Sequence, residues 1–213
     1  MKRGDLIWLG ILGLVIFYII SPWTKELFLK QTSSYPYLGG FIKFGILATM
    51  GEMASIRISK GDWEKPKGLK WKIIIWGLIG VLITLMFSLY SKGVMGSIEA
   101  GYLPGKGSNL AFAFFTASLM NLSFGPVFMG FHKITDTYID LIFVDKVKKP
   151  TLDMVLAKAD WNSFVKFTLI KTIPLFWIPA HTITFMLPVE YRIVVAAMLS
   201  IALGVILSFA KNK

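Results

Sequence analysis

Six runs of apolar residues follow one another along the chain, separated by polar connectors. The runs are Leu6–Ile20, Tyr37–Ile58, Trp71–Tyr90, Leu110–Phe131, Phe164–Leu187 and Val189–Ala210. A transmembrane helix needs roughly 20 predominantly apolar residues, a length that every run except the first reaches. The pattern predicts an all-α protein, a polytopic transmembrane helical bundle of about six spans. We expect residues 1–213 to form a single transmembrane domain.

Two connectors are long enough to have structure of their own. Ser59–Lys70 is rich in Lys, Gly and Pro, whereas Lys133–Asp160 mixes acidic and basic residues. The second predicts a short amphipathic helix at the membrane surface. The first apolar run follows Met1-Lys2-Arg3, as the apolar part of a signal peptide would. No small-residue cleavage pattern follows that run, so we expect it to be retained as a helix.

The composition agrees with a membrane protein. The chain is 55% hydrophobic and only 16% charged, whereas a soluble domain is about 45–50% apolar and about 25% charged. There is no cysteine, which excludes a disulfide scaffold and zinc sites built on thiolates. We also find no nucleophile–base arrangement and no His-Glu-x-x-His motif. The sequence therefore predicts no enzyme activity, no metal site and no cofactor.

The basic residues are distributed unevenly over the connectors. The chain has 23 Lys+Arg and 12 Asp+Glu, a net charge of +11. If the N-terminus is on the cytoplasmic side (inside), 15 of the basic residues in or next to the connectors and tails lie on that side and 5 on the opposite side (outside). The inside set is Lys2, Arg3, Arg57, Lys60, Lys65, Lys67, Lys70, Lys72, Lys133, Lys146, Lys148, Lys149, Lys158, Lys211 and Lys213. This bias follows the positive-inside rule and predicts both termini on the cytoplasmic side. The expected partners are anionic headgroups on that side rather than nucleic acid.

Among the charged residues within the apolar runs, we single out Glu52, Lys43, Lys166 and Lys171. A charge near the middle of a bilayer costs about 2.5–3.5 kcal/mol, so such residues normally pair or line a polar pathway. Glu52 and Lys166 are at similar depth from the inner surface. We therefore predict an ion pair between Glu52 and Lys166 or, one turn deeper, Lys171. Lys43 is near the outer end of its run, where its ammonium group can reach the surface.

Small residues recur every four positions in two of the runs. They are Ala113, Ala117, Asn121 and Gly125 in the fourth run, and Ala196, Ser200, Gly204 and Ser208 in the sixth. Residues four apart share one face of a helix, and small residues there allow close helix packing in a membrane. The alternatives are packing within one chain, an oligomer interface, or the lining of a narrow conduit.

Prolines and one histidine mark the fourth and fifth runs. Pro126, Pro174 and Pro179 lie inside them, and an interior proline removes a backbone hydrogen bond and kinks its helix. We expect His181 to supply a hydrogen bond within the kinked fifth helix rather than to bind a metal.

Three stretches carry a family resemblance, in matching order over residues 35–208. They are Tyr35–Leu38 followed by Gly45 and Gly51-Glu52, then Met120–Pro126, then Thr184–Arg192 ending in Leu207-Ser208. They resemble motifs of the membrane proteins typified by Mpv-seventeen and the twenty-two-kilodalton peroxisomal membrane protein. The family's Gly-Pro-x-x-His-x-Trp-Tyr is reduced here to Leu89–Lys92. Residues 1–34 are an extra N-terminal helix outside the match.

The resemblance implies a polytopic membrane protein of a family proposed to form weakly selective channels. Our leading hypothesis is a pore-like conduit for small solutes, or a regulator of membrane permeability. One alternative is the six-span substrate-binding subunit of a vitamin or small-molecule importer. Another is a non-conducting structural or assembly protein. The 20 Lys and 3 Arg, without an Arg-rich transit peptide, favour a prokaryotic cell membrane. An organelle inner membrane is the expectation for a eukaryotic source.

Overall fold

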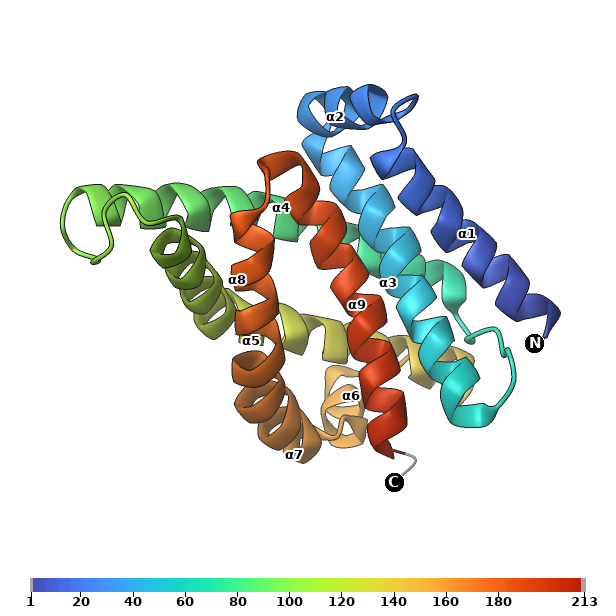
Figure 1. Cartoon of the computed structure of the whole chain (residues 1–213). Coiled ribbons are helices and arrows are strands. Elements are labelled where there is room, and N and C mark those ends of the chain that lie inside the picture. Colours follow the sequence, from blue (N-terminus) through green and yellow to red (C-terminus); the bar gives the residue numbers. More distant parts are fainter. Residues whose placement is uncertain (1, 212–213) are drawn as a thin grey trace.

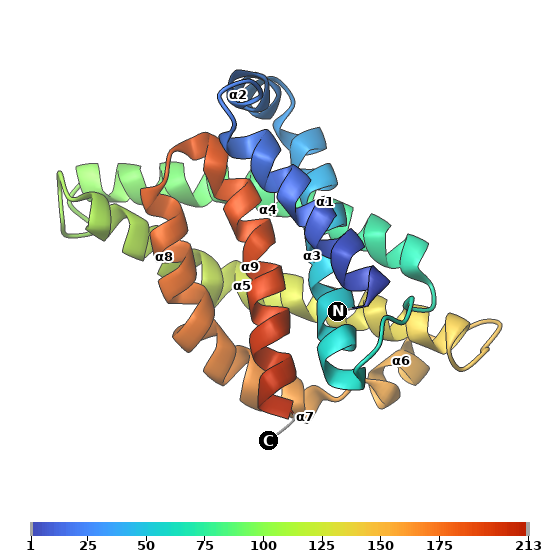
Figure 2. The same ribbon diagram turned by 45° about the vertical axis from the view of Figure 1, so that its right-hand side comes forward.

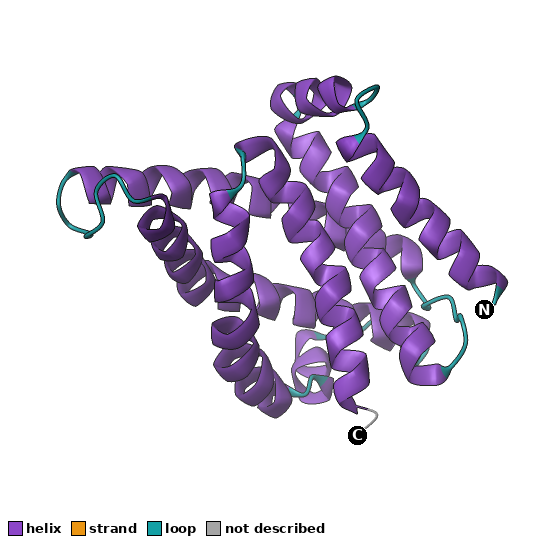
Figure 3. Cartoon of the chain, in the orientation of Figure 1, coloured by secondary structure: helices purple, strands orange, loops and turns teal. Residues whose placement is uncertain are grey.

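Helices and loops make up the whole of the chain that the computed structural model describes, residues 2–211, with no strand among them (Figure 3). Lys213, one of the basic residues expected inside, lies outside this range. The elements are α1 (Arg3–Ile20), α2 (Lys25–Ser34), α3 (Pro36–Lys60), α4 (Leu69–Glu99), α5 (Asn109–Phe143), α6 (Leu152–Lys158), α7 (Trp161–Ser163), the π-helix η1 (Phe164–Trp177), α8 (Ile178–Met186) and α9 (Val189–Lys211).

Five helical segments are long and apolar enough to cross a membrane: α1, α4, α5, the continuous run α7–η1–α8, and α9. Large apolar side chains are also exposed on their surfaces, among them Leu14, Val127 and Ile183. A soluble monomer rarely exposes so much apolar surface, so these features indicate an integral membrane protein. The beginning of α1 and the end of α9 lie at the same end of the bundle (Figure 1). The side of the membrane on which they lie stays a prediction.

The second predicted run, Tyr37–Ile58, lies in α3, which is not among the five helical segments that are long and apolar enough to cross a membrane. This helix is the most enclosed part of the bundle, because α4 and α9 pack along it (Figures 1 and 2). Its buried residues include Phe44, Leu47 and Ala48. Protein rather than lipid therefore surrounds much of α3, which makes its more polar composition tolerable.

Helices α3 and α9 approach so closely that glycine is required at their contact. A Cβ atom added to Gly51 would lie 2.8 Å from the carbonyl oxygen of Ser200, and one added to Gly204 would lie 2.8 Å from the carbonyl oxygen of Gly51. Along the same face, the Ser208 hydroxyl contacts the Ser55 hydroxyl at 2.8 Å. The small residues at intervals of four in α9 thus lie against α3, within one chain.

Several elements extend beyond the lengths that hydropathy predicts. Helix α4 continues past Tyr90 to Glu99, and α5 continues past Phe131 to Phe143. The connector before α3 also contains a helix, α2, which we did not predict; it is anchored by the buried ring of Phe28. Hydropathy identifies the part of a helix that is apolar enough to lie in a bilayer. It does not detect additional turns that carry polar residues on one face. The short helix predicted within Lys133–Asp160 corresponds to α6.

Helix α1 lies at the edge of the bundle (Figure 1). Trp8 and Leu12 pack against the core, and the Trp8 indole donates to the Met50 carbonyl of α3 at 3.0 Å. At the beginning of α1, Arg57 pairs with Asp5 at 2.9 Å, and the indole of Trp63 donates to Asp5 at 2.7 Å. Lys2 pairs with Asp62 in the α3–α4 loop, and this hydrogen bond holds the pKa of Asp62 below its usual range. At the other end, Tyr18 donates to the Gln31 side chain of α2 at 2.6 Å.

Candidate functional site

A small cavity of about 40 Å³ lies inside the bundle, between α3, α4, α5, α8 and α9. We call it the central cavity. Asn121, Gly125, His181 and Ser200 supply most of its polar lining, and aromatic rings supply much of the rest. These four residues were all singled out from the sequence as packing or polar lining, and the fold brings them together. The volume is comparable to that of one water molecule.

A hydrogen-bonded pair spans the central cavity from α5 to α8. The Asn121 amide nitrogen donates to the Ala117 carbonyl at 2.7 Å. Nδ1 of His181 lies 2.9 Å from this nitrogen and 3.1 Å from Oδ1 of the same amide, so either tautomer of the imidazole can form a hydrogen bond with Asn121. The buried His181 ring stacks on Trp177 at 5.2 Å between centroids and meets the edge of Phe87 at 5.6 Å. The pair fixes the position of the aromatic side chains around the cavity.

Replacing Asn121 with leucine is expected to lower the free energy of unfolding by about 1–3 kcal/mol, because it leaves His181 buried without its partner. Replacing both Asn121 and His181 with leucine removes the unpaired group and should cost less than the two single changes together. Unfolding of the purified protein in mixed micelles measures both. Strictly additive losses would contradict a coupled pair.

A second cavity, of about 300 Å³, lies between α4, α5 and η1. We call it the Asp136 cavity. His132, Asp136, Thr168 and Thr172 contribute polar groups, and the His132 ring packs on Trp76 with 4.2 Å between centroids. The rings of Trp76, Phe128 and Trp177 line both this cavity and the central cavity. These three side chains therefore form the partition between the two spaces.

A third cavity, of about 430 Å³, lies beyond the opposite end of the central cavity. We call it the Arg192 cavity. Lys43, Lys92 and Arg192 line it together with Glu190 and several hydroxyl groups. Phe87 lines both this cavity and the central one, and its ring packs on Phe185 with 4.7 Å between centroids. The Phe87 side chain therefore lies between the two spaces.

The three cavities occur in the same order along two helices that run through the bundle. Along α4, the lining passes from Trp76 through Ile83 and Phe87 to Lys92. Along α9, it passes in the opposite direction, from Arg192 through Ser200 to Leu203. Trp76 and Lys92 are about 24 Å apart at 1.5 Å per residue, a distance close to the thickness of a bilayer core.

Next to the Asp136 cavity, one buried lysine holds three carboxylates. Lys72 Nζ lies 2.9 Å from Glu52, 2.5 Å from Asp136 and 3.8 Å from Asp140. The Lys72 side chain is 7% exposed, whereas the carboxyl side chains are 26–36% exposed. The cluster joins α3, α4 and α5 near the beginning of α4. We call it the Lys72 cluster.

The predicted partner of Glu52 was wrong. Glu52 pairs with Lys72, while Lys166 and Lys171 are exposed and form no ion pair among residues 2–211. The physical reason lies in the winding of η1, where hydrogen bonds join residues five apart: the backbone N–H of Ile178 donates to Ile173. Residues five apart then share a face. Lys166 and Lys171 therefore point the same way, away from the bundle.

The same winding aligns the inner face of η1. Phe167, Thr172 and Trp177 follow at intervals of five, and all three line the Asp136 cavity. Pro174 lies within η1, and Pro179 lies just after its end, in the first turn of α8. Pro126 lies inside α5, which continues through it.

Lys72 was missed from the sequence because this residue, next to the start of the third run, was counted with the connector charges. Asp136 and Asp140 were missed because both fall in the connector Lys133–Asp160. A signal was present, since His132, Asp136 and Asp140 recur every four residues, as on one helix face. Lys43, in contrast, behaves as a residue near the outer end of its helix. It donates to Thr32 of α2 at 2.8 Å and lies over the Phe28 ring.

No family model, curated protein or solved structure matches this chain. The resemblance to the Mpv-seventeen family therefore stays a prediction. The fold and the site define a class of protein: an all-helical bundle with helices that could span a membrane and a small central cavity that contains a buried Asn–His pair.

Proposed function

We propose that this protein provides a gated path for small solutes across a membrane. The observation that carries the proposal is the series of three cavities along α4 and α9, in which the side chains shared by neighbouring linings are aromatic: Trp76, Phe128 and Trp177 on one side, Phe87 on the other. A protein that only packs helices together has no need of polar groups at successive depths, since their burial costs free energy.

The partition between the central and Asp136 cavities supports a path for polar molecules. Trp76 and Trp177 both line it, and the indole nitrogen of each is buried without a hydrogen-bond partner among residues 2–211. An unsatisfied buried donor costs about 1–3 kcal/mol. A polar solute or water that passes the partition would accept these hydrogen bonds and lower that cost.

The narrow central cavity makes the structure a closed state of the proposed path. About 40 Å³ holds one water molecule, whereas the flanking cavities are several times larger. Movement of Phe87 at one side and of Trp177 at the other would connect the three spaces. These two side chains are the proposed gates, and the solutes are small polar molecules.

The importer alternative gains less support. It requires a closed pocket near the outer end lined by Trp and His, but the Arg192 cavity has neither in its lining. Trp and His occur instead at the central and Asp136 cavities, and the central one is too small for a vitamin. The structural-protein alternative is decided by the flux experiment below.

Replacing Phe87 and Trp177 together with alanine is expected to raise solute flux by about tenfold or more over the wild type, because both partitions are opened. Stopped-flow shrinkage of liposomes measures it, with urea and glycerol as test solutes. Phe114→Ala is the matched control: Phe114 is an exposed aromatic residue on α5 outside the three cavities, and its replacement should leave flux unchanged.

Before reconstitution, size-exclusion chromatography and circular dichroism show whether each variant is monodisperse and helical, and therefore folded. If liposomes with the folded double variant shrink no faster than protein-free liposomes, the path does not exist. The structural-protein alternative would then hold.

A further inference from the structure

A groove of about 510 Å³ opens on the bundle between α1, α2 and α3, on the other side of Lys43 from the Arg192 cavity. We call it the α1–α2 groove. Its floor is an apolar stripe along α3 formed by Leu38, Ile42 and Ile46, which recur every four residues. Helix α1 contributes Val15, Tyr18 and Ile19 to the lining, and α2 contributes Phe28, Gln31 and Thr32. Helix α2 lies across the end of the bundle where α1 ends and α3 begins (Figures 1 and 2).

Positive charge gathers where the groove meets the Arg192 cavity. Lys43 and Thr32 line both spaces, and Lys92 and Arg192 line the cavity. Glu190 is the carboxylate in this lining, and none of the three basic side chains forms an ion pair within residues 2–211. Three cations therefore face one carboxylate, which leaves a site for an anion.

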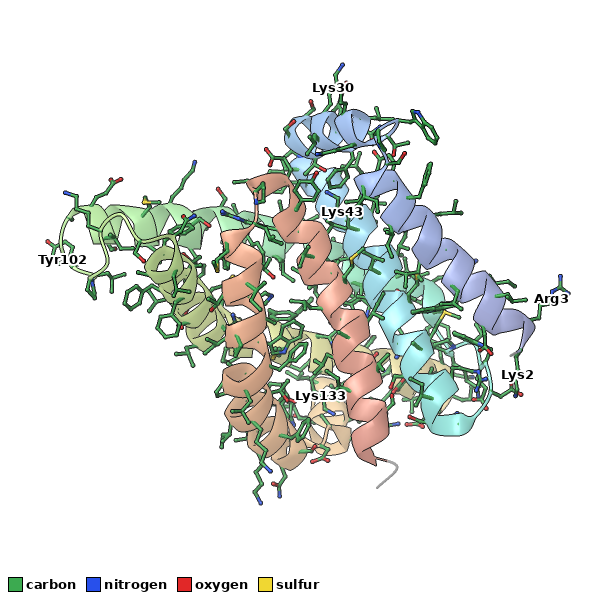
Figure 4. All side chains as sticks on the ribbon, viewed as in Figure 1. Lys2, Arg3, Lys30, Lys43, Tyr102 and Lys133 are labelled. Carbon is green, nitrogen blue, oxygen red and sulfur yellow. The ribbon has the colours of Figure 1, made fainter. Side chains whose placement is uncertain are left out.

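The depth of the Lys43 ammonium group suits a lipid headgroup. The side chain runs back along α3 over Gly39, where a Cβ atom would lie 3.6 Å from Nζ, and ends at the Thr32 hydroxyl of α2. Figure 4 shows Lys43 below α2, while Lys30 points away from the bundle on the opposite side of α2. The ammonium group of Lys43 thus lies at the level of α2, near the end of the bundle, where lipid headgroups would lie.

We propose that the α1–α2 groove binds one anionic phospholipid, with its phosphate group at Lys43 and an acyl chain along Leu38, Ile42 and Ile46. The apolar stripe provides contact for the chain, and Lys43 and Arg192 provide the charge that distinguishes an anionic headgroup from a zwitterionic one. The headgroup site shares Lys43 and Arg192 with the Arg192 cavity of the proposed path. The test measures bound lipid rather than solute flux, so the two proposals fail on different results.

The test measures lipid retained by the purified protein. Delipidated protein in neutral detergent is titrated with phosphatidylglycerol and phosphatidylcholine of the same chain length, and bound lipid is counted by native mass spectrometry. The wild type is expected to retain phosphatidylglycerol with about tenfold preference. Lys43→Gln should reduce this preference to near parity, whereas Lys43→Arg and the control Lys30→Gln should keep it. Equal retention of both lipids by the wild type would overturn the proposal, as would an unchanged preference in Lys43→Gln.

A second variant tests the chain rather than the headgroup. Ile42→Trp fills the groove from an exposed position and should reduce retention of phosphatidylglycerol severalfold. Leu14→Trp adds the same bulk to an exposed position of α1 that does not line the groove, and should leave retention unchanged. An unchanged retention in Ile42→Trp contradicts the assigned groove. Displacement of the lipid by millimolar inorganic phosphate would assign the site to a soluble anion and overturn the lipid.

Discussion

Replacing Lys72 with methionine is expected to lower the free energy of unfolding by about 3 kcal/mol. Removing one member of a buried ion pair costs about 3–5 kcal/mol because the remaining charge is left uncompensated. Here three carboxylates lose their shared cation, but they are 26–36% exposed, so water offsets part of the cost. The lower end of the range therefore applies. Reversible unfolding in mixed micelles with increasing dodecyl sulfate measures the change.

A control variant and a rescue variant test whether the loss of stability comes from the Lys72 cluster. Lys70→Met removes an exposed lysine two residues earlier on the same helix and should change stability by less than about 0.5 kcal/mol. Combining Lys72→Met with Glu52→Gln and Asp136→Asn removes two uncompensated charges and should recover part of the loss. Equal effects of Lys70→Met and Lys72→Met would show that the Lys72 cluster does not stabilise the bundle.

Replacing Gly51 with leucine is expected to separate α3 from α9 and to prevent correct folding. The added Cβ atom would lie 2.8 Å from the Ser200 carbonyl oxygen and 3.0 Å from its carbonyl carbon. These are backbone atoms of a helix and cannot move aside as a flexible side chain can. Even Gly51→Ala should cost about 1–3 kcal/mol, the usual range for overpacking.

A second glycine gives a control of opposite sign. A Cβ atom at Gly93 in α4 meets nothing within 4 Å, and alanine favours a helix over glycine by about 0.5–1 kcal/mol. Gly93→Ala should therefore stabilise the protein while Gly51→Ala destabilises it. The same unfolding assay compares the two. Two changes of the same sign would mean that helix propensity, and not the contact between α3 and α9, decides the result.

Hydropathy located the helices because apolar length is a local property of the chain. Five of the six predicted runs lie inside a continuous helical segment, and Phe164–Leu187 exceeds its segment by one residue. The recurrence of small residues likewise needs only a regular helix, so Gly204 and Gly125 could be assigned to inward faces. Asn121 and His181 meet across the central cavity for the same reason, since each lies on an inward face.

Partners and helix ends could not be predicted in the same way. Lys72 lies close to the beginning of α4, so its position along the sequence suggested a connector charge at the membrane surface. The close approach of α3, α4 and α5 instead makes it the partner of Glu52. Which helices approach one another is a property of the whole bundle. Lys166 and Lys171 were misplaced because their segment is a π-helix, a rare winding that the 3.6-residue period does not describe.

The π-helix from Phe164 to Trp177 also has a consequence for how this segment tolerates changes in length. In an α-helix, removing one residue rotates everything beyond it by about 100°. A π-helix holds more residues in each turn, so the loss of one can be absorbed by conversion of a turn to α geometry. Such a conversion would take Phe167, Thr172 and Trp177 off their common line. A deletion that preserves the fold would therefore still dismantle the wall of the Asp136 cavity, so the number of residues in this segment sets the alignment of that wall as well as the length of the span.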